Sequence, residues 1–350
     1  MVEWKKLGEV CEIGTGSNNR EDCCENGLYP FFVRSKEVLR INSYLFDEEA
    51  ILIPGEGGIG DIFHYINGKY GLHQRAYRVH PINDGIKGKY IYYFLFEYFK
   101  SYIDKKSYKS TATSIRKPML LDFPIPIPSK PEQERIVKIL DTFTDSIANL
   151  KAQIDARRKQ YEYYRDQLLD LEGKEGVEMK TLPQISKNLD SKRKPITSSN
   201  RKPGPYPYYG ASGIVDYVEG YIFEGSYLLI SEDGANLVAR NTPIAFKIEG
   251  KNWVNNHAHV ISFDDDATLK YVEIYLNKID LSPWINGAAQ PKLNQDNLNR
   301  ILIPLPSLEE QSRIVGILDQ FEAIIANLEA QLKAREKQYE YYRNKLLTFE

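Results

Sequence analysis

The sequence predicts an α+β protein in which two globular domains of mixed strands and helices are separated by two long helices that form an antiparallel coiled coil. Three observations predict this fold: a long internal repeat, a heptad pattern within it, and short strand-like runs with glycine turns elsewhere. The predicted segments are a first globular domain at 1–128, a helix at 129–172, a second globular domain at 173–306 and a helix at 307–350.

The repeat consists of two blocks of 42 residues. The block from Pro131 to Glu172 and the block from Glu309 to Glu350 align without gaps, are identical at 27 positions and share the heptapeptide KQYEYYR. Self-similarity of this extent indicates duplication. The chain therefore contains one unit twice, with a globular segment ahead of each block.

Apolar residues recur in each block at alternating spacings of four and three, which predicts a coiled-coil seam. One arginine, Arg157 or Arg335, interrupts each seam. Parallel packing in register would place the two arginines opposite each other, whereas antiparallel packing can place Arg157 opposite Ile325 and Arg335 opposite Ile147. Antiparallel packing is favoured, although an arginine can also extend its head to water. The seam residues are Ile136, Leu140, Phe143, Ile147, Leu150, Ile154, Tyr161, Tyr164, Leu168 and Leu171, with Ile314, Leu318, Phe321, Ile325, Leu328, Leu332, Tyr339, Tyr342, Leu346 and Phe349.

Each helix has a start signal, because Ser129 stands three residues before Glu132 and Ser307 three before Glu310, as in a capping box. Each rod would be about 63 Å long at 1.5 Å per residue. Tyr163 and Tyr341 lie off the seam, so they are predicted to contact a partner protein, with plain exposure as the alternative.

The globular segments contain short strand patterns, such as AILIPGEG at 50–57 and SYLLISEDG at 226–234, and a helical pattern at 89–99. LYPFF at 28–32 also matches PYPYY at 205–209, which indicates that the segments are diverged copies. Near-identical helices are expected to contact the same kind of partner twice. Diverged domains can bind different ligands.

Composition is that of an ordinary soluble protein with a net charge of −2. No apolar run approaches 18 residues and the first residues lack a signal-peptide pattern, so we expect a cytoplasmic protein without membrane contact. Cys11, Cys23 and Cys24 have no second Cys or His cluster at ligand spacing, so we expect reduced thiols and no metal.

The entries into the two helices, IPIPSKPEQERIVKIL and IPLPSLEEQSRIVGIL, together with the order domain, helix, domain, helix, resemble the specificity subunit of type I restriction-modification systems. The resemblance covers the whole chain. GAAQPKL at 287–293 is similar to a motif near the end of that family's recognition domains, whereas STATSIRKPML at 110–120 departs from it. The limits of the first domain's contact loops are therefore open.

The resemblance implies that each domain recognises one half of a split, asymmetric site in double-stranded DNA while the helices hold the domains apart. It implies two modification subunits, which carry S-adenosylmethionine and methylate adenine, and ATP-dependent restriction subunits. The chain itself would hold no cofactor and catalyse nothing.

The residues agree with a non-catalytic role. GEGGIG at 55–60 lacks the lysine of a nucleotide-binding loop, no Asn-Pro-Pro-aromatic stretch is present, and His73, His257 and His259 have no nucleophile partner by motif. Two alternatives remain open: a structural or adhesive coiled-coil protein with ligand-binding heads, and an orphan specificity subunit without a restriction partner.

Base contacts in the major groove favour Arg or Lys for guanine and Asn or Gln for adenine, and phosphates favour basic runs. In the first domain the predicted base contacts are Arg34, Lys36, His73, Gln74 and Arg75, and the predicted phosphate contacts are Lys106, Lys109, Ser110, Thr111, Arg116 and Lys117. In the second domain they are Ser212, Asn236, Arg240, Asn255, Asn256 and His257, with Lys192, Arg193, Lys194, Gln290 and Lys292 nearer the DNA backbone. The alternative for each is a solvated side chain or a turn former.

Overall fold

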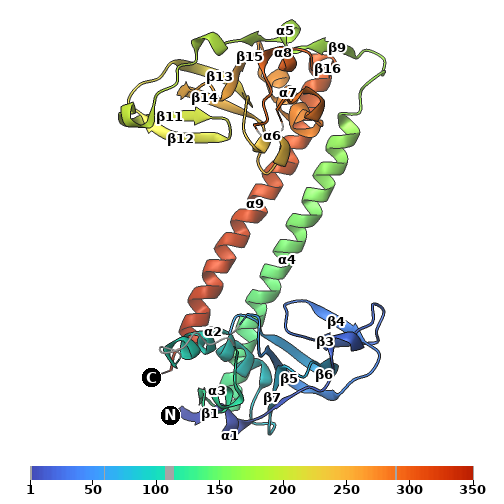
Figure 1. Ribbon diagram of the computed structural model, residues 1–350, viewed down its shortest axis with the longest axis vertical. Coiled ribbons are helices and arrows are strands. Elements are labelled where there is room, and N and C mark those ends of the chain that lie inside the picture. Colours follow the sequence, from blue (N-terminus) through green and yellow to red (C-terminus); the bar gives the residue numbers. More distant parts are fainter. Residues whose placement is uncertain (1, 59, 107–113, 288–289, 350) are drawn as a thin grey trace. The chain divides into compact units, whose positions relative to one another are not determined.

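The computed structural model describes residues 2–58, 60–106, 114–287 and 290–349 (Figure 1). It divides into two compact units, Met1–Lys151 with Ala330–Glu350, and Ala152–Glu329. Each unit contains one sheet domain and one part of each long helix, so the α+β class and the pair of long helices predicted from the sequence are confirmed.

The first sheet domain is a six-stranded sheet with the order β2-β7-β5-β6-β3-β4, beside a small sheet of β1 and β8. Its elements are β1 (Glu3–Lys6), α1 (Leu7–Val10), β2 (Cys11–Thr15), η1 (Arg20–Asp22), β3 (Tyr29–Phe32), β4 (Val38–Ile41), β5 (Phe46–Pro54), β6 (His64–Leu72), β7 (Ala76–Pro81), α2 (Gly88–Lys106), α3 (Lys117–Leu121) and β8 (Pro124–Ile127).

The second sheet domain repeats this topology, with the order β10-β15-β13-β14-β11-β12 beside a small sheet of β16 and β9. Its elements are β9 (Glu178–Thr181), α5 (Leu182–Ile185), β10 (Lys187–Asn188), η2 (Asp190–Lys192), η3 (Ser198–Asn200), β11 (Pro203–Gly210), β12 (Gly213–Val218), β13 (Phe223–Ser231), α6 (Asn236–Ala239), β14 (Ala245–Val254), β15 (Ala258–Ser262), α7 (Asp266–Lys278), η4 (Ser282–Trp284), α8 (Gln295–Leu298) and β16 (Leu302–Leu305).

Both sheets contain one parallel pair, β3 with β6 and β11 with β14, among antiparallel strands. In the first sheet a parallel bridge also joins Asn18, which follows β2, to His73 at the end of β6. This bridge brings the segment after β2 next to the end of β6. Residues 73–75 alone connect β6 to β7. This tight connection places polar side chains at one edge of the sheet.

A helix covers each sheet and is fixed by one buried tyrosine. In α2, Tyr90 donates its hydroxyl to Pro126 O at 2.7 Å, and in α7, Tyr271 donates to Pro304 O at 2.5 Å. Burial of the ring and of the satisfied hydroxyl stabilises the same contact in both domains. The domains are diverged copies, as their sequences predict.

The long helices are α4 (Lys130–Leu168) and α9 (Leu308–Leu347), and a buried glutamine near each start explains the shared Glu-Gln pair. Gln133 donates Nε2 to Pro128 O at 2.9 Å and accepts from Lys87 N at 2.9 Å. Gln311 donates to Pro306 O at 2.8 Å and accepts from Thr268 Oγ1 at 2.7 Å. Each glutamine thus links the long helix to the helix that covers the sheet.

The predicted capping boxes are wrong in their acidic half. Ser307 Oγ accepts from Glu310 N at 3.3 Å, as expected of a cap. However, the carboxylates of Glu132 and Glu310 bind Arg135 and Arg313 one turn further along. A neighbouring guanidinium offers two parallel N–H donors, and it outcompetes the single backbone amide.

The two helices pack antiparallel within each unit. In the first unit the Phe143 ring stacks on Tyr342 with centroids 5.3 Å apart, and Lys151 Nζ lies 3.3 Å from Glu336 Oε1. In the second unit Tyr164 stacks on Phe321 with centroids 5.5 Å apart. Residue numbers rise along one helix as they fall along the other, so antiparallel packing is confirmed.

Arg335, the seam arginine of α9, packs against an aromatic ring and does not face Arg157, as parallel packing would require. The Arg335 guanidinium lies 5.6 Å from the ring centroid of Phe143, one helical turn from the predicted neighbour Ile147. A cation over an aromatic face is tolerated in a seam. No helix formed by the described residues is long and apolar enough to cross a membrane.

Candidate nucleic-acid interface

In the first sheet domain, separate loops meet where β5 ends and β7 begins. Gly55 N donates to Arg75 O at 2.9 Å, which ties the loop after β5 to the turn at 73–75. Ile115 N donates to Gly55 O at 2.8 Å, which brings the segment before α3 to the same edge. The predicted contact residues of the turn and of the segment before α3 therefore lie at the same edge, beside the loop after β5.

The Glu56 carboxylate lies between two of the predicted arginines. Arg34 Nη1 is 2.9 Å and Arg75 Nη1 is 3.2 Å from Glu56 Oε2. The hydrogen bond from Arg34, followed by that from Arg75, lowers the pKa of Glu56, so the carboxylate is charged at neutral pH. Each guanidinium has five N–H donors, and one shared carboxylate leaves several of them for a ligand.

His73 and Gln74 complete this turn. His73 is 6% exposed and its Nδ1 accepts from Arg75 N at 3.0 Å. Burial, reinforced by the charges of Arg34 and Arg75, lowers the pKa of His73, so its ring is neutral at neutral pH. Gln74 is exposed and donates Nε2 to Asn19 Oδ1 at 2.7 Å. A cavity of about 230 Å³ opens beside the turn and is lined by Arg20, Val33, Arg34, Ser35, Glu56, Gly57 and His73.

The second sheet domain carries a similar cluster after β13. His257 Nδ1 lies 2.8 Å from Asp233 Oδ2, and Asn255 Oδ1 accepts from His257 N at 2.8 Å. Glu232 N donates to His257 O at 2.9 Å, and Lys292 Nζ lies 3.1 Å from Glu232 Oε1. Two loops and the turn at 255–257 therefore meet at one sheet edge.

The strand register shows that the two clusters occupy equivalent places. Pro54 of β5 pairs with Ala76, as Ser231 of β13 pairs with Ala258. Counting from these pairs, the first polar turn (residues 73–75) corresponds to the second polar turn (residues 255–257).

The contacts inside the two polar turns correspond as well. The first residue of each turn, His73 or Asn255, accepts a hydrogen bond from the backbone N–H of the third residue. The third residue also binds an acid: Glu56 binds Arg75, and Asp233 binds His257. Each acid stands two positions after the last paired residue of the central strand, which is Pro54 or Ser231. One backbone arrangement therefore presents two different sets of side chains.

A charged network lies next to the second polar turn. Arg193 Nη1 is 2.6 Å from Glu232 Oε2, and Arg193 Nη2 is 3.3 Å from Asp190 Oδ2. His259 places Nδ1 2.6 Å from Asp190 Oδ2 and Nε2 2.8 Å from Leu293 O. Burial would raise the pKa of Asp190, but the hydrogen bond and charge of His259 outweigh it and lower that pKa.

Three members of this network, Asp190, Glu232 and His259, are the one group of potential metal ligands within the described ranges. The Arg193 guanidinium already lies against both carboxylates. A metal ion there would meet a fixed positive charge. The arrangement suits an ion-pair network that positions the loop.

Several other predicted residues border these clusters as exposed side chains. Arg116 directly follows Ile115, whose amide binds Gly55, and Lys117 begins α3. Ser212 follows Ala211, whose carbonyl accepts from Ser231 Oγ at 2.5 Å. The remaining exposed residues of the predicted set are Lys36, Lys192, Lys194, Asn256 and Gln290. Lys106 is the last residue of α2, and Lys109, Ser110 and Thr111 lie outside the described residues.

Four predicted contact residues are engaged within the protein instead. Arg193 is turned inward, and Asn255 is buried with its oxygen bound to the turn. Asn236 closes its own loop through two bonds with Thr242, and Arg240 donates Nη2 to Ile279 O at 2.7 Å. These geometries give them positioning roles.

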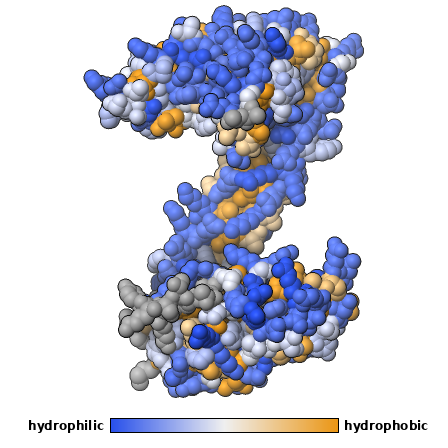
Figure 2. Space-filling view, viewed as in Figure 1, coloured by the Kyte–Doolittle hydropathy of each residue, from blue (hydrophilic) through white to orange (hydrophobic). Residues whose placement is uncertain are grey.

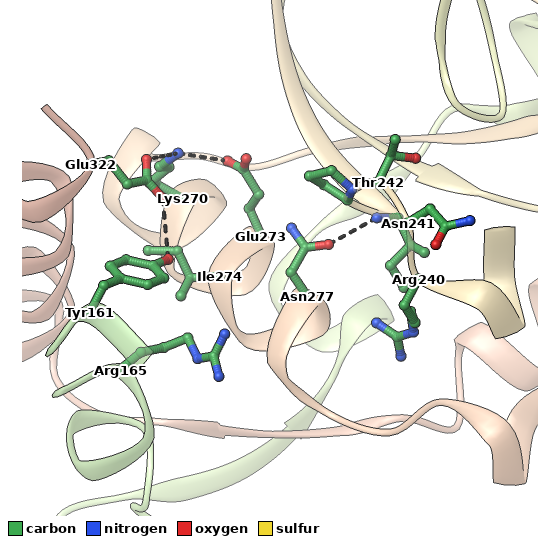
Figure 3. A pocket seen from close by; sticks show the side chains of 12 residues that line it. Tyr161, Arg165, Arg240, Asn241, Thr242, Lys270, Glu273, Ile274, Asn277 and Glu322 are labelled. Carbon is green, nitrogen blue, oxygen red and sulfur yellow. Dashed lines mark hydrogen bonds and ion pairs between the residues drawn. The ribbon is translucent and has the colours of Figure 1, made fainter. Parts of the chain in front are cut away.

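Arg240 also lines a separate pocket of about 450 Å³ in the second unit (Figure 3). Lys270 of α7 bridges Glu273 and Glu322, at 3.3 and 3.8 Å, while Arg165 extends into the space from α4. Burial raises the pKa of Glu273. Lys270, Glu273 and Glu322 pair with one another, so these charges join α7 to α9.

The sequence argument missed the acids. Glu56 and Asp233 each stand beside a glycine in the quoted stretches PGEG and SEDG, yet only basic and amide side chains were sought. An acidic residue beside a glycine turn could have been sought in the sequence, because a charged side chain that contacts a ligand is often held in place by an acid. Figure 2 shows mainly hydrophilic surface on both sheet domains, with scattered apolar patches.

A family model described as "Type I restriction modification DNA specificity domain" matches residues 1–157 and 174–335. A putative type I restriction enzyme specificity subunit of Haemophilus influenzae is 40% identical over 188 residues, which cover 51% of this chain and 48% of the relative. The EcoR124I/EcoR124II specificity subunit of Escherichia coli is 34% identical over 256 residues, covering 65% of this chain and 63% of the relative. The chain thus matches about half to two thirds of the length of these two relatives.

A longer match joins the chain to the EcoprrI specificity subunit of Escherichia coli, at 28% identity over 92% of this chain and 88% of the relative. The crystal structure of a type I restriction-modification S subunit from M. genitalium has a similar fold, with a TM-score of 0.73, 18% identity and coverage of 100% of this chain and 97% of that chain. The family model covers both sheet domains and most of both helices, and the chain belongs to the type I restriction-modification DNA specificity family.

Proposed function

We propose that the chain is the DNA-recognition subunit of a type I restriction-modification complex, and that each sheet domain contacts one half of a split, asymmetric site. The observation that carries this proposal is the pair of equivalent polar turns. One scaffold presents His-Gln-Arg held by a glutamate in the first domain and Asn-Asn-His held by an aspartate in the second. A duplicated scaffold with different donors suits two different base sequences.

The helices would set the distance between the half-sites and bind two modification subunits. Tyr163 and Tyr341 support this role, because these repeat-related side chains are 63% and 60% exposed on α4 and α9. Exposed aromatic side chains are enriched at protein interfaces. S-adenosylmethionine and ATP would be held by the modification and restriction subunits. The complex would work in the cytoplasm, because its DNA substrate is there.

The chain itself would provide recognition and no catalysis. Its three candidate histidines have structural partners: Arg75 N for His73, Asp233 for His257, and Asp190 with Leu293 O for His259. These contacts fix loops and turns. They do not pair a histidine with a nucleophile.

The test uses the full chain with its cognate modification subunit. Methylation mapping of genomic DNA with S-adenosylmethionine should reveal methyladenine at a split, asymmetric site, and a mobility-shift assay should show sequence-specific binding by the complex. The isolated chain should transfer no methyl group above a contaminant control. An assembled complex that neither binds nor methylates DNA specifically, or methyl transfer by the chain alone, would refute the proposal.

A further inference from the structure

We propose that the two polar turns are equivalent base-contacting elements, the first selecting guanine through Arg75 and the second selecting adenine through Asn256. This inference rests on the proposed function and specifies the chemistry of that site. It concerns the exposed second and third residues of each turn. The acids Glu56 and Asp233 are positioning residues.

The first turn can offer a fixed pair of donors. Glu56 holds Arg75 from one side at 3.2 Å, and the guanidinium keeps further N–H donors free. Gln74 is tied to Asn19 at 2.7 Å, which occupies the amide that would otherwise suit adenine. A planar guanidinium that donates two parallel bonds matches guanine O6 and N7.

The second turn offers a different edge at the same place. His257 faces Asp233 through Nδ1, which leaves Nε2 for a ligand, and an imidazole cannot donate two parallel hydrogen bonds as a guanidinium does. Asn256 is exposed between the buried Asn255 and His257. An asparagine amide donates and accepts at once, which matches adenine N6 and N7.

The shared backbone makes an exchange feasible. His73 and Asn255 both accept from the N–H of the third residue, at 3.0 and 2.8 Å, so either can support the turn. Gly55 N and Glu232 N donate to the carbonyl of the third residue in the same way, both at 2.9 Å. Exchanging the three turn residues and their acid should therefore preserve the fold of each turn.

The test transfers the second turn into the first domain with the variant Glu56→Asp, His73→Asn, Gln74→Asn, Arg75→His, in complex with the modification subunit. Methylation mapping should show one guanine of one half-site replaced by adenine, with the other half-site unchanged. The reciprocal variant Asp233→Glu, Asn255→His, Asn256→Gln, His257→Arg should change one adenine of the other half-site to guanine. Lys69→Gln, at an exposed lysine over Tyr44, is the control for loss of a surface charge and should leave the motif unchanged.

Two single variants cover the case in which an exchanged turn fails to fold. Arg75→Ala should reduce discrimination at one base pair by about 5- to 150-fold, and Arg75→Lys, which keeps the charge but loses the bidentate fork, should restore little of it. An unchanged motif in the exchanged or Arg75→Ala complex, or a change in both half-sites, would overturn the inference. A wild-type complex that methylates no split site would instead count against the proposed function.

Discussion

Arg75 Nη1 lies 3.2 Å from Glu56 Oε2, an oxygen that also accepts from Arg34. The partly exposed carboxylate therefore both orients two cations and neutralises part of their charge. Removing it should raise nonspecific affinity and lower specificity, which would distinguish a positioning role from an effect of charge alone.

Glu56→Ala should strengthen nonspecific DNA binding by the complex and weaken base discrimination. The released Arg34 and Arg75 can each contact a phosphate, which would steepen the dependence of log K on log salt by up to about 2. Binding isotherms at several salt concentrations, on specific and scrambled duplexes, measure both effects. Glu37→Ala, at an exposed acid in the loop after β3, makes the same charge change without removing the carboxylate that binds Arg34 and Arg75. Equal behaviour of the two variants would refute the positioning role.

Asp190→Asn should destabilise the second unit by roughly 3 kcal/mol at neutral pH, because it removes the carboxylate that binds His259 and one of the two carboxylates that bind Arg193. Denaturant unfolding followed by tryptophan fluorescence reports mainly on this unit, since Trp253 and Trp284 lie in it and only Trp4 does not. Asp264→Asn is the control, because Asp264 is exposed. A loss no larger than that of the control would contradict the structural role of the network.

The pH dependence follows from the lowered pKa of Asp190. Its folded-state pKa lies below the ordinary value of 3.8, so the contribution to stability is present above that value and is lost as the pH falls from it through the folded-state pKa. The wild-type second unit should therefore lose stability more steeply than Asp190→Asn below about pH 4. If the free energy of unfolding fell equally steeply with decreasing pH in the two proteins, Asp190 would not be the group responsible.

The sequence predicted the parts of this protein that depend on periodicity and duplication. Heptad spacing and the seam arginines predicted antiparallel helices, and the matching LYPFF and PYPYY stretches predicted equivalent strands. Tertiary contacts decided the rest. Arg193 looked like a phosphate contact in a basic run, but Asp190 and Glu232, distant from each other in sequence, draw it inward. The equivalence of the polar turns depends on strand register, which a single sequence does not specify.

The helices should act as a ruler between the half-sites. The predicted register places Leu150 opposite Leu332, so the junction after Leu150 faces the junction after Gln331. Inserting four residues at both junctions should lengthen the helix pair by about 6 Å and the spacer by one or two base pairs at about 3.4 Å each. An insertion of four is a stutter, so the seam should survive with some weakening of binding. Substituting four exposed residues nearby without changing the length is the control. Methylation at the original spacing by the lengthened complex would show that the helices do not set the distance.

The most direct test of the central claim, one domain for each half-site, is methylation mapping of a complex in which residues 177–306 are replaced by the corresponding segment of a related specificity subunit. We expect one half-site to take on the donor's sequence while the other half-site and the spacer stay as they were, because the first domain and both helices are untouched. A motif in which both half-sites change, or in which neither changes although the complex assembles and methylates, would contradict this account.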